Sequence, residues 1–287
     1  MTLSDPTRLL AIDAGNSRLK FGLFVVSPSL SSSELPDLVA SLASSPDDDV
    51  PWPEISGWLA EGDCPRGVVA GSNPTARDKV TASWPTDWPP PVVVDGATSI
   101  PLSVQLADPG KAGVDRLLNA VAVNRLRNPA RGAIIVDSGT ATTVDVVDAE
   151  GDFRGGAILP GFGLLARSLH QYTALLPHVP LDQLGGSAPP PIGTDTTSAI
   201  RSGLFYGQLG AVRELVTELA SLLGGESLEL FLTGGGGPLL ATALDDARLV
   251  PHLGLYGLVL AGLSLADPAL ADLALADLGD EAEAGEQ

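Results

Sequence analysis

A strand, turn and strand pattern occurs twice in this chain and constrains its fold more than any other feature. The first copy, residues 9–24, reads LLAIDAGNSRLKFGLF, and Asp13 ends its first apolar run. The second copy, residues 134–147, reads IIVDSGTATTVDVV and aligns Asp137 with Asp13. Such a motif, repeated 124 residues along the chain, predicts two related halves that face each other across a cleft.

The turn of the first copy carries residue types that suit a phosphate group. Gly15 lets the backbone approach a ligand closely, while Asn16 and Ser17 add donors beside the exposed turn amides. Lys20 adds a cation, and Asp13 is positioned to meet a phosphate through a divalent cation. For one isolated copy, an ordinary hairpin is the alternative. The repetition favours the phosphate interpretation.

Length and charge limit the classes of function. The 287 residues are enough for two domains of ordinary size. The formal net charge is −19, and its excess lies in residues 27–63 and 267–287, neither of which contains Lys or Arg. We expect both segments to be solvated surface. Because basic residues are not clustered, nucleic acid is a poor candidate partner.

Cysteine usage and hydropathy exclude further classes. The single cysteine, Cys64, allows neither an internal disulfide nor a cysteine metal cluster. The apolar stretch at residues 250–266 is interrupted by Pro251, His252 and several glycines, so it predicts a core helix and not a membrane span. The N-terminus has no secretory signal pattern, and we therefore expect a cytoplasmic protein.

Strand and helix patterns alternate in the half that begins with the first motif, which predicts an α/β layer there. Strands are expected at residues 67–72, 91–95 and 229–233. Helices are expected at residues 75–84, 117–126, 162–174, 198–223 and 252–266. Residues 27–54 are predicted to be a surface excursion around one short helix at residues 34–43.

Two other segments carry candidate ligand contacts. Gly234 to Gly237 follow a predicted strand, where bare backbone suits the adenosine side of a nucleotide, with a flexible turn as the alternative. Asp115 and Arg116 lie at the start of the helix that follows Gly113. Asp is favoured near helix N-termini, so capping is the alternative to a chemical role for Asp115.

Taken together, these residues resemble the type III pantothenate kinases, members of the acetate and sugar kinase, heat-shock chaperone and actin superfamily. The resemblance runs from about Leu9 to Leu265. It rests on five ordered blocks: DAGNSRLKFGL at Asp13, PGKAGVDRLLNAVA at Pro109, VDSGTATTVDVV at Asp137, IGTDTTSAIRSG at Ile192 and LTGGGGPLL at Leu232.

The fold implied by this resemblance is α/β, with two ribonuclease-H-like (actin-like ATPase) domains and an active site between them. The N-terminal domain would cover residues 1–130 and the C-terminal domain residues 131–266. Residues 267–287 would form an acidic tail that frays or is disordered. A homodimer is also implied.

The activity implied is phosphoryl transfer from ATP to the primary hydroxyl of pantothenate, giving 4′-phosphopantothenate, the first step of coenzyme A synthesis. Asp115 would be the proton acceptor and Asp137 would bind a monovalent cation, K⁺ or NH₄⁺. The implied ATP-binding residues are Asp13 (also with Mg²⁺), Ala14, Gly15, Asn16, Ser17, Arg18, Leu19, Lys20 and Thr140. The implied pantothenate-binding residues are Gly113, Val114, Asp115, Arg116 and Thr196.

The chain departs from the family pattern at two positions. Ser17 stands where Thr is usual, which keeps the hydroxyl, and Leu106 stands where many members have a Tyr that packs on pantothenate. The shape of the acid pocket is therefore open. Two alternatives also stay open: a non-catalytic regulator, and an enzyme of the same superfamily that acts on another small alcohol.

Overall fold

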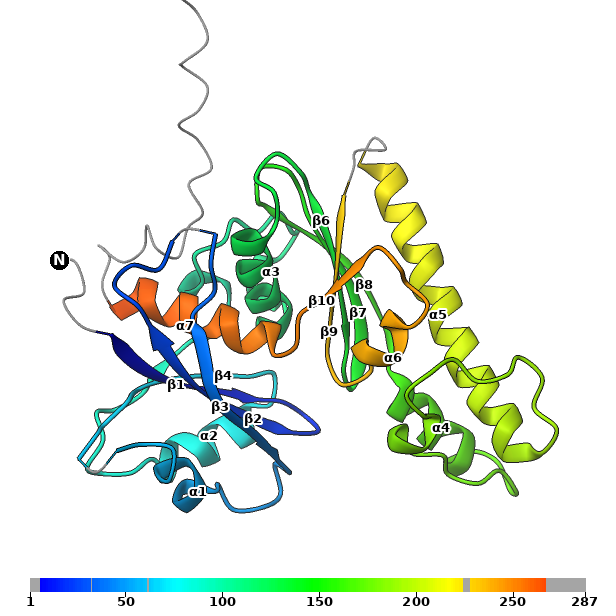
Figure 1. The fold of residues 1–287 in the computed structure, drawn as a ribbon, viewed down its shortest axis with the longest axis horizontal. Coiled ribbons are helices and arrows are strands. Elements are labelled where there is room, and N and C mark those ends of the chain that lie inside the picture. Colours follow the sequence, from blue (N-terminus) through cyan, green and yellow to red (C-terminus); the bar gives the residue numbers. More distant parts are fainter. Residues whose placement is uncertain (1–5, 32, 61, 224–227, 267–287) are drawn as a thin grey trace, which may run out of the picture. The chain divides into compact units, whose positions relative to one another are not determined.

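The computed structural model describes residues 6–31, 33–60, 62–223 and 228–266 (Figure 1). The predicted acidic tail at residues 267–287 lies outside them. The chain divides into two compact units, and each is described by itself. Of the described residues, unit 1 holds those up to Pro129, the short segment Glu150–Phe153 and those from Leu253 to Ala266; unit 2 holds those within Ala130–Ala149 and Arg154–His252.

Unit 1 is built on a five-stranded mixed sheet in the order β3-β2-β1-β4-β5. Its strands are β1 (Thr7–Ala14), β2 (Leu19–Val26), β3 (Asp37–Ser44), β4 (Arg66–Ala70) and β5 (Val92–Val93). β2 pairs antiparallel with both β1 and β3, whereas β4 runs parallel to β1 and to β5. The first predicted hairpin is thus confirmed as β1–β2.

Helices cover both faces of this sheet. On one face, α1 (Trp52–Ser56) and α2 (Pro74–Ala82) pack against Leu10 and Ile12 in one buried cluster. On the other face, α7 (Leu253–Ala266) packs on the sheet and on α3 (Val114–Leu126), as Figure 1 shows in orange and green. Because side chains alternate along a strand, Asp13 points to the face that α7 covers.

The helix predicted at residues 34–43 is wrong, because this segment forms strand β3. Its side chains alternate strictly between exposed and half-buried along Asp37–Ser44, as expected of an edge strand with one solvated face. The Leu and Ala residues that suggested a helix also fit this period of two, and pairing with β2 decides the outcome.

Unit 2 is built on a second five-stranded mixed sheet in the order β10-β9-β6-β7-β8. Its strands are β6 (Ala133–Ser138), β7 (Ala141–Val147), β8 (Phe153–Pro160), β9 (Glu229–Thr233) and β10 (Ala247–Leu249). β6 and β7 form the second predicted hairpin, and β9 runs parallel to both β6 and β10. Read from β8 to β10, the order repeats that of the first sheet, which supports an internal duplication.

One buried cluster joins a single face of the second sheet to the helices of unit 2. These helices are α4 (Phe162–Gln171), α5 (Thr196–Leu222) and α6 (Gly237–Ala241). Val136 and Val144 belong to this cluster, so their neighbours Asp137 and Thr143 point to the opposite face. Three short 3₁₀ turns complete the description: Ala97–Ser99, Pro109–Lys111 and Leu181–Leu184.

The two units differ from the predicted division at residue 130 in two respects. Helix α7 belongs to unit 1 because it packs on α3 and β1. The segment Glu150–Phe153 also belongs there, since Phe153 forms a bridge with Val104 and its backbone bonds Ser103 and Gln105. Among the described residues, no helix has both the length and the apolarity needed to cross a bilayer.

Candidate active site

Asp13 and Lys20 form an ion pair at the end of the first hairpin. They lie directly across from each other in the β1–β2 register, and Lys20 Nζ is 3.1 Å from Asp13 Oδ2. The Asp13 side chain is 10% exposed and that of Lys20 is 42% exposed. The carboxylate is therefore mostly buried, while the ammonium group stays accessible to an anionic ligand.

The turn between β1 and β2 is supported by the residues that follow β4. Within the turn, Gly15 N–H donates to the Arg18 carbonyl over 3.1 Å. Asn73 N–H donates to the Ala14 carbonyl over 3.1 Å, and a Cβ on Gly71 would lie only 2.2 Å from that same oxygen. Gly71 has a φ of +155°, so glycine is required there on two grounds. Residues 71–73 thus pack against the turn and support its shape.

The start of α3 presents Asp115 and Arg116 together. Gly113 is the N-cap residue and makes no side-chain cap, and Asp115 lies in the first turn of the helix. Asp115 Oδ1 accepts from Arg116 N–H over 3.0 Å, and a Cβ on Gly113 would lie 2.7 Å from that oxygen. The Arg116 guanidinium lies over the Phe153 ring, 5.4 Å from its centroid. A carboxylate and a positioned guanidinium therefore share one helix end.

In unit 2, the turn after β6 lies at the corresponding position of its sheet but is shorter, with residues 139–140 between the strands where the first turn has residues 15–18. Asp137 lies at the end of β6, directly across from Thr143 on β7. Gly139 N–H donates to the Ala141 carbonyl over 2.9 Å and closes the turn. The Thr140 carbonyl accepts from Gly161 N–H over 3.1 Å, which ties the turn to the start of α4.

The predicted glycine run lies directly against this second turn. Gly234 has a φ of +83°, and a Cβ there would lie 2.4 Å from Asp137 Oδ1. Gly236 N–H donates to the Ser138 carbonyl over 2.8 Å. The carboxyl ends of the parallel strands β6 and β9 thus lie side by side, next to the glycine backbone that follows β9. Open α/β sheets bind ligands at this edge, beyond the carboxyl ends of their strands.

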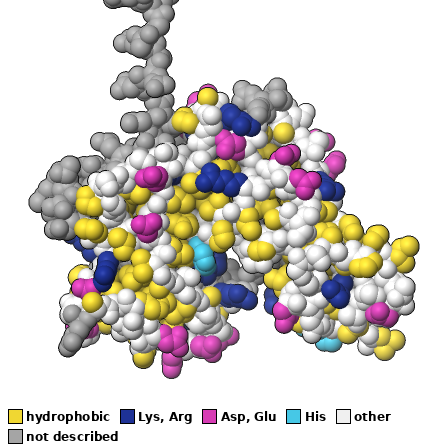
Figure 2. Space-filling model, viewed as in Figure 1, with side chains coloured by type: hydrophobic (Ala, Val, Ile, Leu, Met, Phe, Trp, Pro, Cys, Tyr) yellow, Lys and Arg dark blue, Asp and Glu magenta, His cyan; other side chains and the backbone are white. Residues whose placement is uncertain are grey.

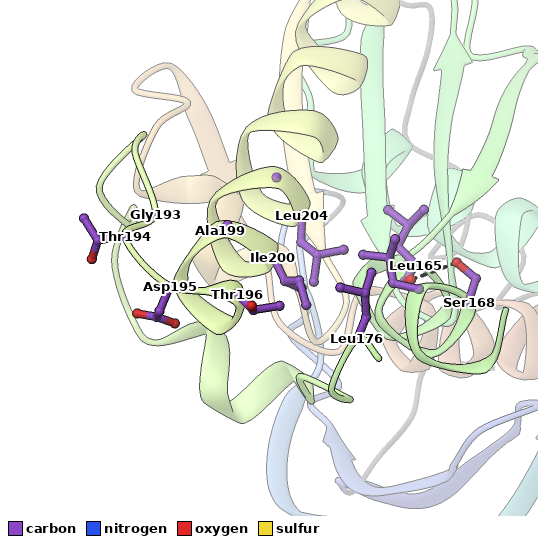
Figure 3. A pocket seen from close by; sticks show the side chains of 12 residues that line it. Leu165, Ser168, Leu176, Gly193, Thr194, Asp195, Thr196, Ala199, Ile200 and Leu204 are labelled. Carbon is purple, nitrogen blue, oxygen red and sulfur yellow. Dashed lines mark hydrogen bonds between the residues drawn. The ribbon is translucent and has the colours of Figure 1, made fainter. Parts of the chain in front are cut away.

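Thr196 is the first residue of α5 and borders an open groove of about 760 Å³ between α4 and α5. Figure 3 shows leucine side chains on the groove walls, including Leu165 and Leu204, with Thr196 and Asp195 at the helix start. Asp195 caps α5 by accepting from Ser198 N–H over 2.9 Å. Hydrogen bonds from the Ser198 backbone and hydroxyl hold the pKa of Asp195 below its usual value.

The candidate residues therefore fall into two sets. Unit 1 holds the Asp13 turn, Lys20 and residues 113–116, and unit 2 holds Asp137, Thr140 and Thr196. Sequence reasoning missed residues 71–73 and Gly161 as supports of the two turns. A glycine that follows an apolar strand and precedes Ser-Asn-Pro was the available signal for the first of these supports.

The residues present fit magnesium held with a nucleotide better than a metal held by protein alone. The described part of the chain contains no group of three or more His, Cys, Asp or Glu that could hold a metal ion. Mg²⁺ in kinases is ordinarily held by one or two carboxylates together with substrate phosphates. Asp13, with its hard oxygen ligands beside a phosphate-type turn, meets that requirement.

Charges on the visible surface are dispersed. Figure 2 shows Lys and Arg side chains scattered singly among acidic and neutral ones on the face drawn, with no continuous basic patch there. The face shown therefore has none of the clustered cations that a phosphate backbone requires.

Comparisons with known proteins agree on one family. The model of the family described as type III pantothenate kinase matches residues 9–218. A type III pantothenate kinase from Paramagnetospirillum magneticum is 34% identical over 247 residues, which is 82% of this chain and 88% of the relative. One from Alkalilimnicola ehrlichii is 37% identical over 257 residues, covering 87% and 95% respectively.

Solved structures agree on the fold. A protein from Campylobacter jejuni described as a conserved Baf family transcriptional activator matches with a TM-score of 0.57 and 17% identity, over 91% of this chain and 100% of that one. An activator of 2-hydroxyisocaproyl-CoA dehydratase from Clostridium difficile, with ADPNP bound, gives 0.50 and 14%, over 93% and 98%. The two five-stranded mixed sheets are those of the actin-like ATPase fold.

Proposed function

The chain belongs to the type III pantothenate kinase family, and from that premise we propose how its residues carry out phosphoryl transfer. The primary hydroxyl of pantothenate attacks the γ-phosphorus of ATP. The bond from that phosphorus to the β,γ-bridging oxygen breaks, and ADP leaves with its electron pair. Asp115 takes the hydroxyl proton, and 4′-phosphopantothenate is formed.

The Asp13 turn supplies the phosphate-binding half of the proposed site. Two observations support this role. The accessible ammonium group of Lys20 lies beside the mostly buried carboxylate of Asp13, and Gly71 supports the shape of the adjoining turn. Lys20 neutralises phosphate oxygens, and Asp13 reaches them through Mg²⁺. Since little covalent chemistry falls to the protein in a loose phosphoryl transfer, alignment and charge neutralisation provide most of the acceleration.

Asp115 is the proposed proton acceptor. Support comes from its position in the first turn of α3, where its Oδ1 is held by the Arg116 N–H and Gly113 leaves room beside it. A carboxylate within hydrogen-bond reach of the substrate hydroxyl can take its proton as a general base. Arg116 is the proposed partner of the pantothenate carboxylate, since a guanidinium pairs with a carboxylate in bidentate fashion.

The turn at residues 138–141 and the glycine run supply the proposed nucleotide contacts of unit 2. Thr140 contacts ATP, and the bare backbone of Gly234 to Gly237 lies against the adenosine side. Asp137 binds a monovalent cation through its hard carboxylate oxygens. Thr196, at the start of α5, contacts pantothenate.

We also propose that the enzyme is a homodimer. An exposed strip of α5 that includes part of the groove wall supports this, because Ala199, Gly203 and Gly207 are exposed along it and a Cβ on either glycine would meet nothing within 4 Å. Tyr206, on the same face, is 39% exposed. A strip of small side chains beside an aromatic ring lets a second helix approach closely. Light scattering of the wild type and of Gly207→Gln tests this: we expect a dimer for the wild type and a weakened dimer for the variant.

The proposed reaction rests mainly on the family match, which covers both hairpin turns. In each hairpin a carboxylate, Asp13 or Asp137, lies near the end of the first strand. The test is a coupled assay of ADP release with wild-type enzyme, ATP and Mg²⁺, in K⁺ or choline buffers. Pantothenate, glycerol, acetate and a hexose are supplied separately. K⁺-dependent turnover with pantothenate alone is expected. Turnover with another alcohol instead would reject the substrate, and no turnover with any of them would favour a regulator.

A further inference from the structure

The side chain of Thr143 is a buried polar group that the proposed reaction does not yet use. Thr143 is 9% exposed, and its hydroxyl oxygen has no hydrogen-bond partner among the described residues. Removing a hydroxyl from water without a compensating partner costs free energy, so such a group in a folded protein calls for a bound water or ion.

Thr143 shares its face of the sheet with Asp137. The two residues lie directly across from each other in the antiparallel β6–β7 pair. Side chains of directly opposed residues point to the same face, with Cβ atoms about 4.5–5.5 Å apart. Val136 and Val144, which join the buried core with α5, point to the other face. The hydroxyl and the carboxylate therefore lie side by side, away from that core.

Space beside the Asp137 carboxylate is kept free of side chains by Gly234. A Cβ at Gly234 would lie 2.4 Å from Asp137 Oδ1, so any other residue would crowd the carboxylate oxygen. Its φ of +83° also favours glycine. Oxygen atoms from a carboxylate and a hydroxyl, next to backbone carbonyls, are the ligand types that alkali cations prefer.

The two halves of the duplication differ at one position that bears on the cation. In unit 1 the residue across from Asp13 is Lys20, whose ammonium group lies 3.1 Å from the carboxylate. In unit 2 the corresponding residue across from Asp137 is the uncharged Thr143. A lysine at this position would occupy the space that an ion needs, whereas a threonine offers a neutral oxygen.

From these observations we infer that Thr143 Oγ1 is a ligand of the monovalent cation held by Asp137. This inference rests on the proposed function, which places the cation at Asp137. Thr143 is thus a cation-binding residue of unit 2, and its hydroxyl strengthens binding of K⁺ without taking part in proton transfer.

Thermal unfolding in K⁺ titrations at constant ionic strength, balanced with choline, tests the inference without measuring turnover. Thr143→Val removes the hydroxyl and keeps the shape, and Thr143→Ser keeps the hydroxyl. Thr142→Val is the matched control, since Thr142 is on the same strand but points to the opposite face, toward Ser138. K⁺ is expected to raise Tm, and the K⁺ concentration that gives half of this rise measures the affinity for the ion. We expect that concentration to increase about tenfold in Thr143→Val, because one contact to a charged group is lost.

Two further outcomes make the test specific. In choline alone, Thr143→Val is expected to unfold at the same or a higher temperature than the wild type, because an unpaired buried hydroxyl is replaced by a methyl group. Thr143→Ser and Thr142→Val are expected to keep the wild-type K⁺ response. An unchanged response in Thr143→Val, an equal change in Thr142→Val, or a wild type indifferent to K⁺ would overturn the inference.

Failure of the inference can be told apart from failure of the proposed function. A K⁺-stabilised wild type that phosphorylates no pantothenate would reject the function and leave the ion site intact. A wild type with K⁺-dependent turnover and a Thr143→Val variant with unchanged K⁺ affinity would reject the ion ligand alone.

Discussion

Lys20 lies directly across the β1–β2 pair from Asp13, and its Nζ is 3.1 Å from Asp13 Oδ2. The corresponding position in the second hairpin, across from Asp137, is Thr143. The duplication thus keeps the carboxylate in both halves and changes its cross-strand neighbour. One half carries a protein cation that suits phosphate, and the other carries a neutral oxygen.

Replacing Lys20 by Met is expected to weaken use of ATP. The change removes a positive charge beside the phosphate turn and leaves the mostly buried Asp13 carboxylate without this ion pair. We expect kcat/KM for ATP to fall by about 10²-fold, as for loss of one preorganised electrostatic group. Steady-state kinetics at varied ATP measures this. Lys20→Arg is the control and should keep most of the activity, while an unchanged kcat/KM in Lys20→Met would show that the turn does not bind phosphate.

Replacing Gly71 by Ala is expected to distort the phosphate turn. The new Cβ would lie 2.2 Å from the Ala14 carbonyl oxygen, and the φ of +155° is unfavourable for alanine. We expect the free energy of unfolding to fall by about 1–3 kcal/mol, as in overpacked sites, and KM for ATP to rise. Chemical denaturation and kinetics measure the two effects.

The control for Gly71→Ala is Gly186→Ala. Gly186 is exposed, and a Cβ there would meet nothing within 4 Å. Its free energy of unfolding should change by less than about 0.5 kcal/mol. Equal effects at the two glycines would contradict a specific support of the turn by Gly71.

The two hairpins and most helices were predictable because each has a local pattern. Each hairpin is recognisable from a short stretch of sequence, in which an apolar run leads into a carboxylate and a turn that contains glycine. The α3 segment shows helical periodicity by itself. Strand β3 was not predictable in the same way, since Leu and Ala suit either structure and pairing with β2 decides between them.

The supports of the candidate site depend on contacts that are distant in sequence. Gly71 acts on Ala14, and Gly234 acts on Asp137, through close approaches that no local pattern encodes. The placement of α7 in unit 1, far in sequence from the other elements of that unit, is likewise decided by packing on α3. The sequence therefore predicts candidate residues for the chemistry, whereas the contacts that support those residues are visible only in the structure.

Replacing Arg116 by Lys is expected to weaken pantothenate binding more than turnover. The guanidinium lies 5.4 Å from the Phe153 ring centroid, and lysine can neither stack on that ring in the same way nor pair with a carboxylate in bidentate fashion. We expect KM for pantothenate to rise about tenfold while kcat stays within about threefold. Arg213→Lys, at an exposed arginine of α5, is the control. A fall in kcat with an unchanged KM would contradict the binding role.

The capping residue Asp195 predicts a pH-dependent contribution to stability. Hydrogen bonds from Ser198 lower the folded-state pKa of Asp195 below the value of 3.8 expected in an unfolded chain. A lowered pKa gives stability that is present above pH 3.8 and is lost as the pH falls through the folded-state value. Tm measured from pH 7 to pH 2 should be higher for the wild type than for Asp195→Asn, with the difference vanishing at the acidic end.

The control for Asp195→Asn is Asp246→Asn, at an exposed residue just before β10. That variant should follow the wild type at every pH. A constant difference between the wild type and Asp195→Asn across the whole range would show that the charge of Asp195 does not stabilise α5.

The most direct test of the proposed mechanism is the turnover of Asp115→Asn with saturating ATP, pantothenate, Mg²⁺ and K⁺. The amide keeps the size of the side chain and removes the proton acceptor, and Asp108→Asn, at an exposed aspartate before α3, is the control. We predict that kcat falls by about 10²–10⁴-fold in Asp115→Asn, with Tm and the KM for ATP near wild type, and that Asp108→Asn is unaffected. A kcat for Asp115→Asn within a few-fold of the wild type would contradict the account.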